Sequence, residues 1–118
     1  MQRFTELRVW QRSHTLTLEI YKLTEGFPRH EKFGLVSQIR RAAASVPTNI
    51  AEGSKRQSHQ DFARFLNIAE GSLAETEYLL MLGRDLGYVL GRRSDNCFTE
   101  IAQIARMLHG LRTKVERV

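Results

Sequence analysis

The sequence has one cysteine, Cys97, and two prolines among its 118 residues. A single cysteine cannot form a disulfide within the chain, and no cysteine pair is present for a zinc site. No apolar run approaches the ~20 residues that a membrane-spanning helix needs, and the first ten residues lack the apolar core of a signal peptide. We therefore expect a cytoplasmic protein that makes no contact with a membrane, with Cys97 as a small buried residue.

Motifs for catalysis and for metal binding are also missing. The Glu-x-x-His spacing of di-iron bundles does not occur, and His30-Glu31 is not followed by a histidine at the zincin spacing. There is no glycine-rich phosphate loop, and no local grouping of serine, histidine and acid marks a nucleophile. We expect no catalytic residues, no metal and no cofactor, and an enzyme ranks below the binding functions considered next.

The composition is that of a basic globular protein. Hydrophobic residues make up 42% of the chain, enough for a single domain over residues 1–118. The net charge is +5, and it is unevenly distributed. Residues 29–56 carry six basic and two acidic groups, residues 57–91 two and five, and residues 92–118 six and three. The positive surface is suited to a polyanion, although an ordinary solvated surface explains it equally well.

The central stretch, residues 31–53, has the clearest helical pattern. Apolar residues recur at steps of three and four and predict one buried stripe: Leu35, Ile39, Ala42, Val46 and Ile50. Polar residues recur at the same steps beside them: Gln38, Arg41, Ser45, Asn49 and Glu52. We predict one helix with an apolar face in the core and a polar face suited to another polar surface.

Proline and small residues shape this predicted helix. Pro47 has no backbone N–H and crowds the carbonyl of Ala43, so we predict a kink near Pro47 rather than a break. Gly53 fits the position after a helix that favours a left-handed residue. The alanines at 42–44 leave room for close approach of another helix, and Gly71 in the next helix is the expected partner.

Three further helices are predicted. The first spans about residues 5–25, and its two apolar stripes suggest contact with another subunit as well as the core. The third follows Ser58, which resembles a capping-box residue, and runs to about Gly87. The fourth is capped by Ser94 or Asp95. Short loops between four helices predict an all-α, antiparallel up-down-up-down four-helix bundle.

Basic residues on several segments are expected to face a polyanion. They are Arg40, Lys55, Arg56, Arg92, Arg93, Arg112, Lys114 and Arg117. No aromatic residue interleaves with them, and no known nucleic-acid module is recognisable. We therefore expect salt-sensitive contacts to phosphate without sequence preference, in RNA or in DNA.

A second set of polar residues is expected to join the second and third helices, or to join subunits, through hydrogen bonds. It comprises Gln38, Arg41, Ser45, Asn49, Glu52, Glu70, Ser72 and Glu75. A network satisfies polar groups that are removed from water. An alternative interpretation makes a binding pocket of some of these residues and one more: Asn49, Glu52, Glu70, Ser72, Glu75 and Glu77.

Several motifs resemble those of a known family. They include Val9-Trp10, Phe27-Pro28, Ser37-Gln38-Ile39-Arg40-Arg41-Ala42-Ala43, Ser45-Val46-Pro47, Asn49-Ile50-Ala51-Glu52-Gly53 and Gly71-Ser72. The chain resembles, over about residues 5–90, the four-helix bundle proteins encoded in intervening sequences of bacterial large-subunit ribosomal RNA genes.

This resemblance implies an antiparallel bundle that assembles into a ring-shaped homopentamer. It also implies a weaker relation, of fold more than of motif, to the accessory variability determinant of diversity-generating retroelements, a basic pentamer that binds nucleic acid and a reverse transcriptase. No catalytic residues come with the resemblance. We expect a non-catalytic nucleic-acid-binding or scaffold protein, and the alternative is an adaptor that binds an acidic protein.

Overall fold

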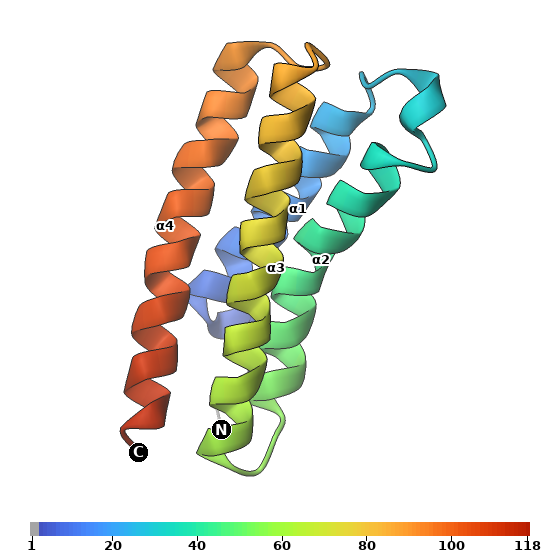
Figure 1. The fold of residues 1–118 in the computed structure, drawn as a ribbon. Helices are drawn as coiled ribbons and strands as arrows, with labels where there is room; N and C mark the ends of the chain where they lie inside the picture. The colour runs from blue at the N-terminus through green and yellow to red at the C-terminus, as the bar shows by residue number, and fades with distance from the viewer. Residues whose placement is uncertain (1–2) are drawn as a thin grey trace.

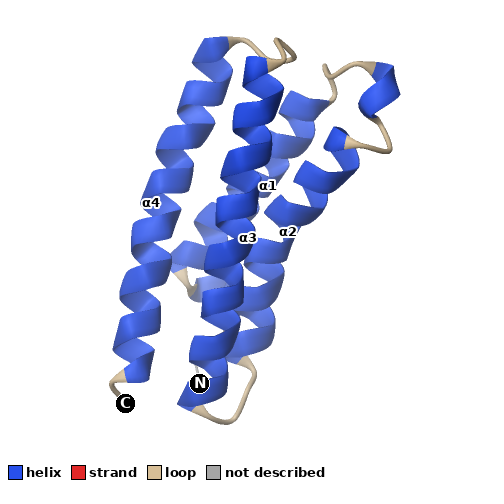
Figure 2. Ribbon diagram, in the orientation of Figure 1, coloured by secondary structure: helices blue, strands red, loops and turns tan. Residues whose placement is uncertain are grey.

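Four α-helices make up most of the chain in a computed structural model that describes residues 3–118. Helix α1 spans Arg8–Thr24, α2 Leu35–Ser54, α3 His59–Asp85 and α4 Gly91–Glu116, and short 3-10 helices precede α1 (η1, Phe4–Glu6) and α2 (η2, Arg29–Glu31). Figure 2 shows only helices and loops in the described part. The all-α, four-helix prediction is confirmed, while Met1 and Gln2 of the predicted domain lie outside the described residues.

The helices form a closed bundle. Figure 1 shows that each helix runs in the direction opposite to the one before it. Helices that follow one another in the sequence contact each other, and α1 also contacts α4, so the four helices surround one core. The bundle is elongated, with principal extents of 45 × 24 × 20 Å, so its two ends are separate surfaces. One end carries the α2–α3 loop and the C-terminus of α4, and the other carries the α1–α2 and α3–α4 connections.

The core contains apolar side chains from all four helices. The largest fully buried ones are Leu16, Ile20, Ile39, Val46, Ile50, Leu66, Leu73, Leu80, Ile101, Ile104 and Leu108. The apolar stripe predicted for the second helix is buried at all five positions. Burial of such a stripe, rather than helix propensity, supplies most of the stability of a helix in a protein.

The second helix begins later than the sequence suggested. Residues 29–31 form η2, and α2 starts only at Leu35. Gly34 has φ −107° and ψ −108°, which is not helical. The carboxylate of Glu31 accepts a hydrogen bond from the Leu35 N–H at 3.2 Å and so caps α2 from outside the helix. The start predicted at Glu31 was wrong because Gly34 breaks the pattern.

The roles predicted for two glycines were wrong. Gly53 is inside α2, which continues to Ser54, and a Cβ built on Gly53 would lie 2.7 Å from the Cβ of Phe65 on α3. Gly53 therefore permits close helix contact and is not a left-handed cap. Gly71 is exposed, with nothing within 4 Å of its Cβ position, so it does not pack on residues 42–44. Among residues 3–118 only Gly87 has a positive φ, +82°, in the turn before α4.

The fourth helix begins earlier than predicted. It starts at Gly91, and neither Ser94 nor Asp95 is its cap. Ser94 is buried in the first turn, where its hydroxyl donates to the carbonyl of Gly91 at 2.9 Å. The chain reverses direction at the turn containing Gly87 and enters α4 at Gly91 without a side-chain cap.

Pro47 lies within α2, and its missing N–H has a structural consequence for the carbonyl of Ala43. The hydroxyl of Thr17 on α1 lies 3.2 Å from that oxygen and 2.8 Å from the carbonyl of Ser13. The single hydroxyl hydrogen is shared between the two acceptors. Thr17 thus gives Ala43 a partner that the proline withholds. The kink near Pro47 stays a prediction.

Replacing Thr17 by valine keeps the side-chain shape and removes the hydroxyl. We expect the free energy of unfolding to fall by about 1 kcal/mol. This is the lower end of the range for a buried acceptor that loses its partner, and we expect the lower end because Thr17 shares its hydrogen between two acceptors. In a Pro47→Ala background the loss should shrink, since an alanine N–H can donate to Ala43. Chemical denaturation of the four proteins measures this coupling, and equal losses in both backgrounds would contradict it.

A bidentate ion pair ties α1 to α4. Arg12 Nε lies 2.7 Å from Glu100 Oε1, and Arg12 Nη2 lies 2.8 Å from Oε2. This hydrogen bonding lowers the pKa of the Glu100 carboxyl below its ordinary value of 4.5. A carboxyl whose pKa is lower in the folded state stabilises the fold above its unfolded pKa, and the contribution disappears as the pH falls.

Removal of the Glu100 charge should therefore matter at neutral pH and not in acid. We expect Glu100→Gln to be less stable than the parent at about pH 7, and the difference to shrink below about pH 4.5 as the parent's carboxyl is protonated. Urea unfolding at several pH values measures it. A difference that is the same at about pH 7 and about pH 3 would show that the charge of Glu100 plays no part.

Candidate nucleic-acid interface

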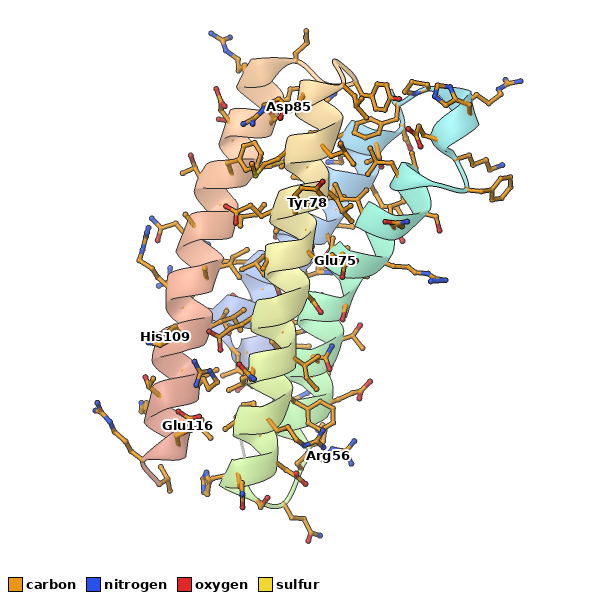
Figure 3. All side chains as sticks on the ribbon, in the orientation of Figure 1. Arg56, Glu75, Tyr78, Asp85, His109 and Glu116 are labelled. Atoms are coloured by element: carbon orange, nitrogen blue, oxygen red, sulfur yellow. The ribbon has the colours of Figure 1, made fainter. Side chains whose placement is uncertain are left out.

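Lys55 and Arg56 lie in the loop between α2 and α3, at the end of the bundle where Figure 3 labels Arg56. Both side chains are exposed. The loop is short because α3 starts at His59, and Ser58 caps it by accepting a hydrogen bond from the Asp61 N–H at 3.0 Å. The predicted cap is confirmed, and it fixes where the loop presents its two positive charges.

The ring of Phe65 holds Arg56 in place. The guanidinium carbon of Arg56 lies 4.7 Å from the ring centroid, and that of Arg64 lies 4.6 Å from the same centroid. Phe65 is buried, so its ring orients these arginines and offers no face to a base. Arg64 is also 3.4 Å from the carboxylate of Asp61, whereas Arg56 keeps its charge for an outside partner.

The C-terminal turn of α4 adds two more cations at the same end. Lys114 and Arg117 are exposed, and positive charge in a last turn is favoured by the helix dipole. An open pocket of about 640 Å³ separates this turn from the start of α3, with His59 and Glu116 among its lining residues. Figure 3 labels Glu116 near the C-terminal end of α4. The four exposed cations Lys55, Arg56, Lys114 and Arg117, called the basic end below, therefore share one end of the bundle.

Arg112 and Glu70 have different partners from those expected. Arg112 donates from Nε to Glu70, and its Nη1 lies 3.1 Å from a carboxylate oxygen of Glu116. The hydrogen bond to Glu70 raises the pKa of the Arg112 guanidinium. Glu70 therefore joins α3 to α4 rather than to α2, and Arg112, matched by two acids, has little charge left for a polyanion.

The remaining predicted cations lie away from the basic end. Arg40 binds α1: its Nε donates to Thr24 Oγ1 at 2.9 Å and its Nη2 to the carbonyl of Tyr21 at 3.1 Å. At 1.5 Å per residue along α2, Arg40 lies about 22 Å from Lys55. Arg92 and Arg93 are in the first turn of α4, at the opposite end. The eight predicted residues do not form one surface.

Part of the predicted polar set joins α2 to α3. The hydroxyl oxygens of Ser45 and Ser72 are 2.9 Å apart. The Asn49 amide donates to both the carbonyl and the hydroxyl of Ser45, at 2.8 and 2.9 Å. These three residues make a small network between the helices. The other members of the set, apart from Glu70, are exposed: Gln38, Arg41, Glu52 and Glu75.

The outer face of α3 also exposes apolar side chains. Ile68 is 42% exposed and Tyr78 59% exposed, and Figure 3 labels Tyr78 and Glu75 on this helix. Together with exposed Arg41 and Glu52 on neighbouring α2, they form a mixed polar and apolar surface. Surfaces of this composition are common in protein contacts.

The geometry gives no local support to catalysis or metal binding. Within residues 3–118 no three histidine, cysteine or acidic side chains gather as a metal would require. Cys97 is buried as predicted, and burial raises the pKa of its thiol, which keeps it protonated and unreactive. No helix in the described part has the length and apolar character to cross a bilayer.

Sequence reasoning missed a cluster in the α1–α2 connection. Arg29, Lys32 and Phe33 are all exposed there. The signal was present in Lys32-Phe33-Gly34, since a glycine inside a helical pattern costs about 1 kcal/mol relative to alanine and weakens the prediction of an uninterrupted helix. Because the second helix was predicted to begin at Glu31, these side chains were assigned to a helix.

Comparison with known proteins places the chain in a family. A search of curated proteins gives no match. Among solved structures, the chain is similar to a protein of unknown function from the S23 ribosomal protein family of Bacteroides thetaiotaomicron, with 28% identity, a TM-score of 0.79, and coverage of 87% of this chain and 96% of that one. The family model described as 23S rRNA-intervening sequence protein matches residues 5–110. Since this match spans most of the chain, the chain belongs to the 23S rRNA-intervening sequence protein family.

Proposed function

We propose that this protein is a non-catalytic, cytoplasmic bundle that binds nucleic acid through its basic end. The carrying observation is that Lys55, Arg56, Lys114 and Arg117 are exposed at one end of the elongated bundle. Arg64 and Arg112 at the same end are paired with acids, whereas these four cations make no ion pair with an acid among the described residues. Positive charge concentrated on one surface attracts phosphate without reading sequence.

We further propose that the protein acts as a homo-oligomer, most simply a ring of five. The support is the family resemblance together with the mixed surface of α2 and α3 that includes Ile68, Tyr78 and Arg41. A ring would present five basic ends to one polyanion. Several weak sites on one assembly raise overall affinity through effective concentration, so modest charge on each chain is sufficient.

Replacing Lys55 and Arg56 by glutamine tests the basic end. We expect weaker binding to a short duplex at low salt, and a plot of log affinity against log salt concentration that is shallower by about 1–2, since each lost phosphate contact removes about 0.9 from the slope. Fluorescence anisotropy with a labelled duplex across a salt series gives both quantities. We expect the oligomeric mass to stay the same, and a lower mass for this variant would mean that the loop takes part in the subunit contact.

A control for net charge is available at the other end. Arg92→Gln with Arg93→Gln removes two positive charges from the first turn of α4 and also tests whether these residues bind nucleic acid. We expect little change in duplex affinity. Equal weakening of duplex affinity by both double variants would show that the affinity depends on net charge and not on the position of the charges. If Lys55→Gln/Arg56→Gln binds the duplex as the parent does, the basic end is not the nucleic-acid-binding site. An acidic protein partner would then become the leading hypothesis.

A further inference from the structure

The connection between α1 and α2 forms an open pocket lined by three cations. It lies at the end of the bundle opposite the α2–α3 loop, where the chain is cyan in Figure 1. The pocket has a volume of about 310 Å³, and Arg29, Lys32 and Arg40 line it with a single acidic residue, Glu25. Three positive groups against one negative group give this pocket a positive potential, which favours an anion.

Arg40 is fixed in this pocket before any ligand arrives. Its Nε and Nη2 bond to Thr24 and to the carbonyl of Tyr21, and its guanidinium carbon lies 4.5 Å from the centroid of the Tyr21 ring. Its third nitrogen, Nη1, takes part in neither bond. A guanidinium that is already oriented loses less entropy when it binds an anion, and its planar fork suits phosphate.

The other acid of the connection is bonded elsewhere. Glu31 Oε1 accepts a hydrogen bond from the Leu35 N–H, and its Oε2 accepts one from the hydroxyl of Tyr88 at 3.0 Å. Glu31 thus links the start of α2 to the α3–α4 connection. It fixes the loop without adding its charge to the pocket lining.

Phe33 stands beside the pocket with its ring in solvent. Its side chain is 89% exposed, and the ammonium nitrogen of Lys32, which lines the pocket, lies 5.4 Å from the ring centroid. At this exposure the ring gains little from packing within the chain. An aromatic face next to a positively charged groove is the arrangement by which proteins bind single-stranded nucleic acid.

We infer that this corner binds a single-stranded segment of nucleic acid, with a phosphate in the pocket of Arg29, Lys32 and Arg40 and an unpaired base stacked on Phe33. Lys32 belongs to both parts and connects them. A base inside a duplex is already stacked on its neighbours, so the corner selects single strands. The inference rests on the proposed function, which identifies nucleic acid as the ligand. It adds a second binding site and specifies that this site takes single strands.

The test compares a labelled oligothymidine of about six nucleotides with a short duplex, by fluorescence anisotropy on the full chain at low salt. Phe33→Ala should weaken hexamer binding about five- to 150-fold, the range expected for loss of one stacking aromatic, and leave duplex binding unchanged. Leu90→Ala is the matched control, since Leu90 is 77% exposed at the same end of the bundle. It should change neither affinity.

Charge variants test the phosphate part separately. Arg29→Gln with Lys32→Gln should weaken binding of the hexamer and of inorganic tripolyphosphate, which has no base to stack. Phe33→Ala should affect only the hexamer. Glu25→Gln should strengthen both, because it removes the acid from the pocket. A loss of tripolyphosphate binding on Phe33→Ala would contradict the assignment of the ring to the base.

The inference is overturned if Phe33→Ala binds the hexamer within about twofold of the parent, or if Leu90→Ala weakens hexamer binding as much as Phe33→Ala does. It is also overturned if Phe33→Ala weakens duplex binding as much as hexamer binding. A change in the oligomeric mass of Phe33→Ala would overturn it too, because another copy of the chain would then cover the ring. The proposed function fails separately, through Lys55→Gln/Arg56→Gln and the duplex. A parent chain that binds hexamer and no duplex supports the corner alone, and one that binds neither overturns both.

Discussion

Truncation of Leu66 to alanine should lower the free energy of unfolding by about 2–5 kcal/mol, the range expected for a fully buried leucine. Leu66 is fully buried on α3, and each of the four helices contributes side chains to the core around it. The loss combines the transfer of the deleted carbons with the cavity that remains. Guanidinium denaturation should show a lower midpoint with an unchanged slope.

Ile68, two residues further along α3, is the control for this prediction. It is 42% exposed, so Ile68→Ala should cost well under half as much as Leu66→Ala in the folding of one chain. If the mixed α2 and α3 surface joins subunits, Ile68→Ala should instead lower the oligomeric mass at a given concentration. Equal destabilisation by the two variants at every protein concentration would contradict the assigned register of α3.

Gly53→Ala and Gly71→Ala should shift stability in opposite directions. At Gly53 a new Cβ would lie 2.7 Å from the Phe65 Cβ, which is fixed to the backbone of α3 and cannot rotate away. Overpacking of this kind costs about 1–3 kcal/mol. At Gly71 a new Cβ meets open space, so alanine should stabilise the helix by about 1 kcal/mol.

The difference between these two variants, about 2–4 kcal/mol, is the measured quantity. Thermal or chemical unfolding of both proteins at the same concentration gives it, and the shared substitution cancels most effects of composition. The same sign for both would mean that the close contact of α2 and α3 at Gly53 is wrong. A destabilised Gly71→Ala with reduced mass would place Gly71 in a subunit contact.

Apolar periodicity was enough to predict the helices and their inward faces. The stripe from Leu35 to Ile50 is buried throughout, because residues three and four apart must share a face of a helix. The cap at Ser58 was also predictable, since it depends only on residues within one turn. Both features are local, and the sequence contains everything that decides them.

Features that depend on a second helix were not predictable. Gly53 and Gly71 look alike in the sequence, and only the approach of Phe65 distinguishes them. Glu70 lies on the side of α3 that faces Arg112 of α4, which requires knowing how α3 is rotated in the bundle. The start of α4 at Gly91 depends on the turn at Gly87 rather than on a polar cap.

The same limit applies to the candidate interface. Sequence reasoning identified the exposed cations Lys55 and Arg56, but it grouped them with Arg40, which the length of α2 separates from them. It did not identify Phe33, because a one-turn error in the start of α2 hid the exposure of its ring. A sequence shows which residues are charged, but which of them share a surface depends on how the helices pack.

The central claim is that an oligomer of this chain binds polyanions through phosphate contacts at its basic end. The most direct measurement is light-scattering mass in solution, alone and with short RNA and DNA duplexes, across a salt series. We predict a species near five times 13.6 kDa that binds duplex at low salt and releases it as salt rises. A monomer, or a stable oligomer that ignores both duplexes at low salt, would contradict the claim.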